Sequence, residues 1–165
     1  MKKNFKSLIY NEYWCKCLDV INGDTCKVSY EISPGKYKIF NVFLSDMSCD
    51  DINSENKENK RYANLCKNRL LQLITFNFDI KINKNYSKKF IKELLNTKVY
   101  MILIKIEKFD KYGRILAKIY TSWSLFKSLQ NYLISENFAI LDIIGDLKIM
   151  PNIINEEDLV KNIFE

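Results

Sequence analysis

The stretch Lys108-Phe109-Asp110-Lys111-Tyr112-Gly113-Arg114-Ile115-Leu116-Ala117-Lys118-Ile119-Tyr120 is a charged turn followed by a β-strand. Gly113 supplies the positive φ that such a tight turn needs. The runs on either side therefore predict a hairpin, with strands over Lys98 to Ile106 and Ile115 to Tyr120. Its turn carries Arg114, and a guanidinium can bind phosphate through two parallel hydrogen bonds.

A second hairpin is predicted far upstream, around the turn Asn22-Gly23-Asp24. Strand-forming residues fill Tyr13 to Ile21 before this turn and Thr25 to Tyr30 after it. Ser33-Pro34-Gly35 marks another turn, and Lys36 to Leu44 alternates as a third strand does. The first part of the chain is therefore expected to be a three-stranded meander.

Helical periodicity appears between these two strand regions. Asn53 to Lys60 is charged and predicts an exposed loop, after which the apolar residues from Tyr62 to Ile74 keep the spacing of an amphipathic helix. Phe76 to Lys81 alternates like a short strand, and Ser87 to Asn96 repeats the helical pattern. This extra segment, about residues 75–96, separates the helix from the next strand.

Two more helices are expected near the C-terminus. Ser122 or Ser124 can cap the first of them, which ends near Asn137. Its buried stripe is predicted to contain Leu125, Phe126, Leu129, Tyr132 and Leu133. Asn155 to Asp158 begins the second, with acidic residues in its first turn.

Composition limits the classes of function. The chain has 165 residues, 47% of them hydrophobic, which suits one well-packed domain over residues 1–165. Histidine is absent, and this excludes His-dependent nucleases, catalytic triads and His-containing zinc sites. A net charge of +6 permits contact with phosphate and also fits a solvated basic surface.

The five cysteines form an odd set without a CxxC pair, which indicates reduced thiols and an intracellular location. The basic N-terminus has no apolar run long enough for a signal peptide, and no transmembrane span is predicted, so we expect no membrane association. The compartment that we expect is the cytoplasm or a virion.

The two hairpins, in this order and with an acidic turn at Asp46 between them, resemble the staphylococcal nuclease (thermonuclease) family. The resemblance implies an α+β fold: a five-stranded OB-fold β-barrel with packed helices, here with residues 75–96 inserted. Compact relatives of this family are encoded by large DNA viruses as well as bacteria, so the resemblance is also compatible with a viral origin of this chain.

The resemblance also assigns site residues. It implies that calcium is held by Asp24, Asp46 and the backbone carbonyl of Met47, that Arg114 is the second catalytic arginine, and that Lys111 and Tyr112 flank the nucleotide. Asn41 and Cys49 stand where the family has its first catalytic arginine and its catalytic glutamate. Asp24 and Asp46 could instead only stabilise turns, and Arg114 could only hold its hairpin.

The two lost groups favour a catalytically impaired protein. Loss of a general base costs roughly 10² to 10⁴ in rate, and loss of one transition-state donor about 10² to 10³. We therefore expect a pseudonuclease that binds single-stranded DNA or RNA, with weak calcium binding. Two alternatives stay open: an active calcium-dependent phosphodiesterase with a substitute acid such as Asp50 or Asp51, and a structural or assembly protein that binds a protein partner through the inserted segment.

Overall fold

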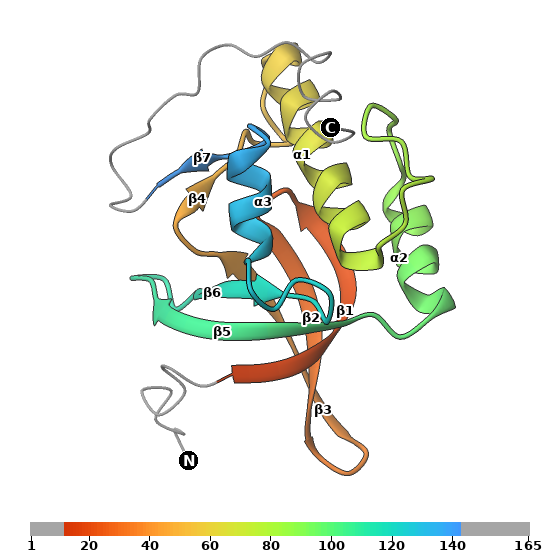
Figure 1. The fold of residues 1–165 in the computed structure, drawn as a ribbon, viewed down its shortest axis with the longest axis vertical. Helices are drawn as coiled ribbons and strands as arrows, with labels where there is room; N and C mark the ends of the chain where they lie inside the picture. The colour runs from red at the N-terminus through yellow and green to blue at the C-terminus, as the bar shows by residue number, and fades with distance from the viewer. Residues whose placement is uncertain (1–11, 143–165) are drawn as a thin grey trace.

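Five strands close into a barrel in the computed structural model, which describes residues 12–142 (Figure 1). The order around the barrel is β1-β2-β3-β6-β5, and β1 pairs with β5 to close it. Neighbouring strands are antiparallel except β3 and β6, which are parallel. The strands are β1 (Glu12–Asn22), β2 (Thr25–Ser33), β3 (Lys36–Leu44), β5 (Met101–Phe109) and β6 (Ile115–Tyr120). The predicted α+β barrel is confirmed.

The barrel interior is filled by side chains that alternate along each strand. On β3, Val42 and Leu44 are buried, whereas Asn41, which precedes Val42, is exposed. The other strands contribute further buried residues, which are Cys15, Cys17, Cys26, Val28, Ile102, Ile104, Ile106, Ala117 and Ile119. The cysteines that the structure describes are all free thiols.

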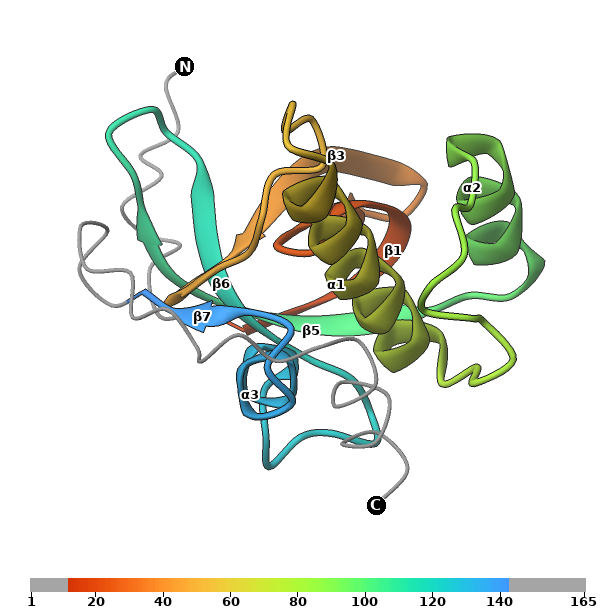
Figure 2. The ribbon, with the colours of Figure 1, turned by 90° about the horizontal axis from the view of Figure 1, so that it is seen from above.

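In the part of the chain that the structure describes, three helices cover the barrel, and a small second sheet joins β4 (Met47–Ser48) to β7 (Ile140–Leu141) (Figure 2). The longest helix, α1 (Lys57–Thr75), begins inside the predicted Asn53 to Lys60 loop, so that boundary was wrong. The reason is a cap that we did not predict. The Asn56 side chain accepts hydrogen bonds from the backbone N–H groups of Glu58 and Asn59.

The last described helix, α3 (Leu129–Ser135), starts later than predicted because Ser128 is its N-cap. Ser124 instead uses its hydroxyl to accept a hydrogen bond from the Thr121 backbone N–H at 2.9 Å. Leu125 and Phe126 precede the helix and are exposed, so only Leu129 and Leu133 of the predicted stripe are buried. The helix predicted from Asn155 lies outside the described residues.

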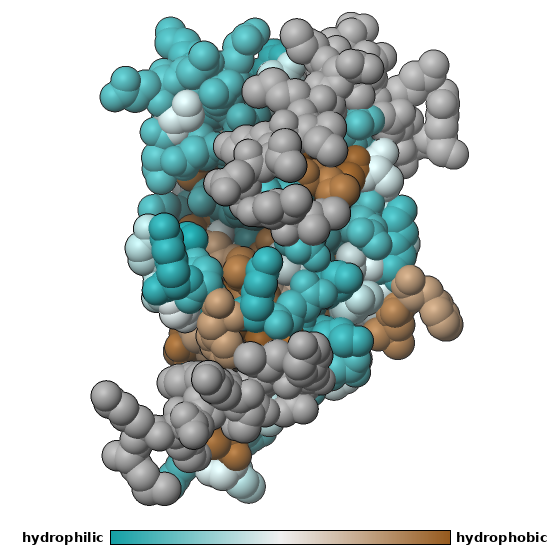
Figure 3. Space-filling view, turned by 90° about the vertical axis from the view of Figure 1, so that its left-hand side faces the viewer, coloured by the Kyte–Doolittle hydropathy of each residue, from teal (hydrophilic) through white to brown (hydrophobic). Residues whose placement is uncertain are grey.

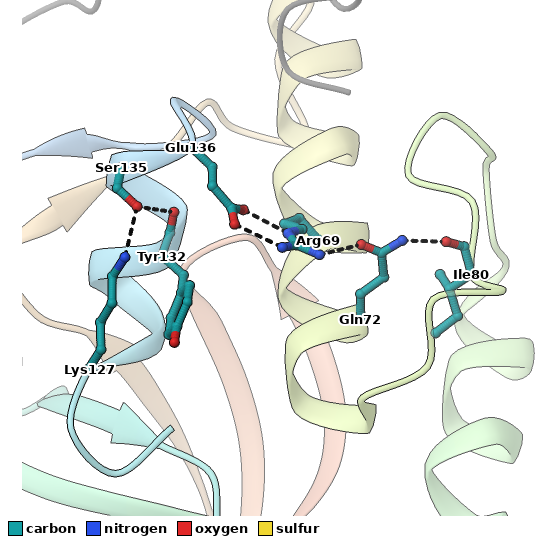
Figure 4. Close-up of polar contacts among 7 residues, drawn as sticks. All are labelled: Arg69, Gln72, Ile80, Lys127, Tyr132, Ser135 and Glu136. Carbon is teal, nitrogen blue, oxygen red and sulfur yellow. Dashed lines mark hydrogen bonds and ion pairs between the residues drawn. The ribbon is translucent and has the colours of Figure 1, made fainter. Parts of the chain in front are cut away.

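The inserted segment corrects the prediction of a strand over Phe76 to Lys81. It is an irregular loop with turns, followed by α2 (Lys88–Thr97). Amide side chains on one face of α1 hold the loop. Gln72 donates to the carbonyl of Ile80 (Figure 4), and Asn68 donates to the carbonyls of Ile82 at 2.7 Å and Lys84 at 2.6 Å. These bonds satisfy loop carbonyls that a sheet would otherwise pair.

The same helix is joined to α3 by a buried ion pair (Figure 4). Arg69 donates from Nε and Nη2 to the two carboxylate oxygens of Glu136, at 2.7 and 2.8 Å. Its Nη1 donates to the Gln72 side chain at 2.9 Å. Because Gln72 also binds Ile80, one connected set of polar groups joins α3, α1 and the inserted loop.

The inserted segment is also part of the hydrophobic core. Ile80, Ile82, Ile91 and Leu95 are all buried, and α2 packs against β1. The segment therefore lies outside the five-stranded barrel and still contributes to the hydrophobic core. None of the described helices is long and apolar enough to cross a membrane.

Replacing Ile91 by alanine should therefore lower the free energy of unfolding by about 2–5 kcal/mol, since it leaves a cavity between α2 and the barrel. The matched control is Phe90→Ala, because Phe90 is the neighbouring residue on α2 and is 41% exposed. Urea unfolding of both variants measures the difference. Equal losses for the two would show that α2 does not contribute to the core.

Candidate functional site

Three turns that are far apart in sequence meet at one end of the barrel. The backbone N–H of Leu44 donates to the carbonyl of Asp24 at 2.8 Å, and that of Ser45 donates to the carbonyl of Ala117 at 3.0 Å. The parallel pairing of Val42 with Ile115 sets the β5–β6 turn beside β3. The sequence-predicted site residues are therefore gathered in one region, although their side chains have different neighbours.

Arg114 is oriented by its own turn. Asp110 accepts hydrogen bonds from the backbone N–H groups of Tyr112 and Arg114, each at 2.9 Å, and from the Arg114 guanidinium. Slight desolvation raises the pKa of the Asp110 carboxyl. These hydrogen bonds and the charge of Arg114 outweigh that effect, so the pKa is lowered. The bonds fix the turn, and half of the Arg114 side chain is still exposed.

Aromatic rings surround the Arg114 guanidinium. Its central carbon lies 4.9 Å from the centroid of the Phe43 ring and 5.4 Å from that of Tyr112. Tyr112 is 72% exposed, and the Lys111 ammonium lies 5.1 Å from its ring. Figure 3 views the molecule from the side of this turn and shows hydrophilic side chains with hydrophobic ones between them. A planar cation and an exposed ring are thus available together.

The outer face of β3 continues this surface. Tyr37, Ile39 and Asn41 are exposed there, and Asn41 pairs across the sheet with Lys27 of β2. Sequence reasoning missed Lys27 and Phe43. The strand alternation that located Asn41 could have found Phe43, because both share one face. Lys27 required the register of β2 against β3.

Asp24 has a partly enclosed carboxylate. Burial raises its pKa, and a hydrogen bond from the Thr25 hydroxyl at 2.8 Å opposes that shift. Its other neighbours are Cys49, which hydrogen-bonds to it, and Asp51, whose charge raises the pKa further. This carboxylate lies against thiols and another acid, and no described lysine or arginine forms an ion pair with it.

Cys49, which the resemblance predicted to stand at a glutamate position, faces inward. A hydrogen bond with Cys66 and burial raise its pKa far above the ordinary value, so the thiol stays protonated. Both sulfurs crowd Gly23, where an added Cβ would lie 2.5 Å from Cys66 Sγ and 3.1 Å from Cys49 Sγ. The thiol therefore fills space around the β1–β2 turn, and it supplies no base.

Asp46 has a different set of neighbours. Its backbone has a φ of 58°, and its carbonyl accepts from the Asp142 N–H at 2.9 Å. Burial and then the charge of Glu107 raise the pKa of Asp46, while Lys108 and Lys118 oppose this, and the two carboxyl groups form a hydrogen bond. Glu107, which also pairs with Lys118 at 3.3 Å, is a third residue that sequence reasoning missed.

The described residues contain no group of three or more acidic or cysteine side chains that could hold a metal ion. Asp46 and Glu107 together provide carboxylate oxygens at one position, and Asp24 provides a carboxylate with different neighbours. Met47 is buried and pairs with Leu141 across the β4–β7 sheet. Calcium binding by Asp24, Asp46 and the Met47 carbonyl stays a prediction.

The raised pKa of Asp24 makes stability depend on pH. A carboxyl whose folded pKa is raised stabilises the fold while it is protonated, and that contribution is lost as the pH rises through the folded pKa. Asp24→Asn should therefore raise the melting temperature at pH 7, and the gain should vanish below the ordinary value of 3.8. Thermal unfolding from pH 3 to 8 measures this. Asp79→Asn, on an exposed residue, is the control, and a gain that does not change with pH would contradict burial as the cause.

Comparison with models of protein families and with curated proteins finds no match to this chain. Its function is therefore inferred from the geometry of this end of the barrel.

Proposed function

We propose that this chain is a nucleic-acid-binding OB-fold domain of the staphylococcal nuclease type whose hydrolytic centre has degenerated. The strand order and the parallel β3–β6 pairing support the OB-fold part of this proposal. The proposed ligand is single-stranded DNA or RNA, bound across β3 and the β5–β6 turn.

One observation carries the proposal. The Arg114 guanidinium lies over Phe43 and beside the exposed ring of Tyr112, with Lys111 next to it. Single strands are bound by positive side chains along the backbone and by aromatic rings on which bases stack. Tyr112 offers an exposed ring for one base, and Arg114 offers a phosphate contact.

The outer face of β3 extends the proposed path. Lys27 and Asn41 lie opposite each other, and the rings and apolar groups of Tyr37 and Ile39 are exposed beyond them. A strand of nucleic acid that starts at the β5–β6 turn would meet a cation, an amide and an aromatic ring in turn. Lys27 supplies charge close to the position where Asn41 replaces the family's arginine.

The same surroundings support loss of hydrolysis. A protonated Cys49 cannot activate water, and Asn41 gives no charge to a phosphorus that is being attacked. Asp110 also shares the Arg114 guanidinium, which leaves less of it for a phosphate. Binding without rapid turnover is the function that fits these residues.

A calcium-dependent phosphodiesterase is the second candidate, and the carboxyl pair of Asp46 and Glu107 favours it. Glu107, on β5, replaces Asp50 and Asp51 as the proposed substitute acid, because it shares a hydrogen bond with the proposed metal ligand Asp46. In this version Asp46 would bind calcium, and Glu107 would accept a proton from water.

Tyr112→Ala should weaken binding of a short single-stranded oligonucleotide about tenfold, because stacking on an aromatic ring contributes roughly 1–3 kcal/mol per base. Fluorescence anisotropy at several salt concentrations measures the affinity and its salt dependence. The control is Phe126→Ala, an exposed aromatic on the β6–α3 loop. If both variants bind like the wild type, the β5–β6 turn is not the binding site.

The purified protein should hydrolyse single-stranded DNA and RNA in calcium no faster than in chelator, because no general base occupies the family's position. A plate assay followed by a single-turnover assay measures this, with Asp46→Ala as the control. Turnover near the enzyme median of roughly 10 per second would overturn impaired catalysis. Loss of that turnover in Glu107→Gln would establish the second candidate.

A further inference from the structure

A basic cavity lies between α1 and the inserted loop. Its volume is about 560 Å³, within the range of roughly 300–1,000 Å³ typical of small-molecule sites. The β5–β6 turn and α2 lie on opposite sides of the molecule in two views (Figures 1 and 2). The cavity is lined by the inserted loop that precedes α2, so it is distinct from the proposed nucleic-acid surface.

The walls of the cavity are positively charged. Successive turns of α1 contribute four basic residues to the lining, which are Lys57, Lys60, Arg61 and Lys67. None of the described lining residues is acidic. The spacing of these residues sets them along one side of the helix. Such a set attracts an anion.

Lys67 differs from an ordinary surface lysine. It is 6% exposed, lines the cavity, and has no hydrogen bond or ion pair with a described residue. Burial lowers the pKa of its ammonium, with Asp19 opposing that shift and Lys88 adding to it. Asp19 itself is 4.0 Å from the Lys92 ammonium. Burying an amine without a close counterion costs free energy, which a bound anion would recover.

The opposite wall is held in place. Asn64 and Asn68 both donate to the carbonyl of Lys84, at 3.1 and 2.6 Å, and Tyr86 accepts from the Lys81 backbone N–H at 2.9 Å. The loop therefore presents the amides of Asn83 and Asn85 to the cavity beside Tyr86. Amides in this position can bind the edge of a base or a sugar hydroxyl.

We propose that this cavity binds the phosphate groups of a nucleotide, with Lys67 as the central contact. The lysines and Arg61 would hold the phosphates, and the loop amides would bind the rest of the ligand. The same chemistry is found in a free nucleoside triphosphate and in the phosphorylated end of a nucleic acid strand. This binding is independent of the surface around Arg114.

The test uses the full chain and calorimetric titration with inorganic pyrophosphate, a nucleoside triphosphate, and an oligonucleotide with or without a 5′-phosphate. Lys67→Met removes the charge and keeps the length of the side chain. We expect its Kd for pyrophosphate to be about tenfold weaker, since one charge-assisted hydrogen bond is lost. Without ligand, the variant should melt at a higher temperature than the wild type.

Lys98→Met is the matched control, because it removes the same charge from an exposed lysine that does not line the cavity. It and Tyr112→Ala should bind pyrophosphate like the wild type. Tighter binding of the triphosphate than of either oligonucleotide would support a free nucleotide, and a preference for the phosphorylated oligonucleotide would support a strand end. No binding of any probe at millimolar concentration, or equal binding by Lys67→Met and the wild type, would overturn the proposal.

Discussion

The polar face of α1 is the constraint on which the arrangement around the barrel depends. Arg69 binds Glu136 at the end of α3 and, through Gln72, the inserted loop, so one buried guanidinium holds two elements against the same helix. Its removal would leave the Glu136 carboxylate without a partner in a site that is largely shielded from water. The hydrogen bonds of Arg69 and Gln72 therefore fix α3 and the inserted loop around the barrel.

The same helix contributes residues to two separate regions of the structure. Near the β1–β2 turn, Cys66 of α1 packs against Gly23 and hydrogen-bonds to Cys49. On its other side α1 carries the lysines of the basic cavity. The Cys49 thiol is thus part of the packing between α1 and the β1–β2 turn.

Strands and turns could be predicted from the sequence because their signals are local. Alternation located the barrel strands, and the turn around Gly113 located Arg114. The inserted loop could not be predicted, because its carbonyls are satisfied by Asn68 and Gln72 rather than by a neighbouring strand. The contact of Asp46 with Glu107 and the pairing of Lys27 with Asn41 depend on register and tertiary approach, which local patterns do not contain.

The closure of the barrel has a consequence for how the chain folds. β1 pairs with β2 across a tight turn, but its other edge must wait for β5, with Glu12 meeting Lys105 and Lys16 meeting Met101. Contacts between residues so distant in sequence slow folding, since the entropy of the intervening chain is lost before the strands gain anything. During synthesis on the ribosome, the outer edge of β1 therefore stays unpaired until the inserted segment and β5 have emerged. That edge, like the edge of β3 that waits for β6, is open to pairing with another molecule during synthesis.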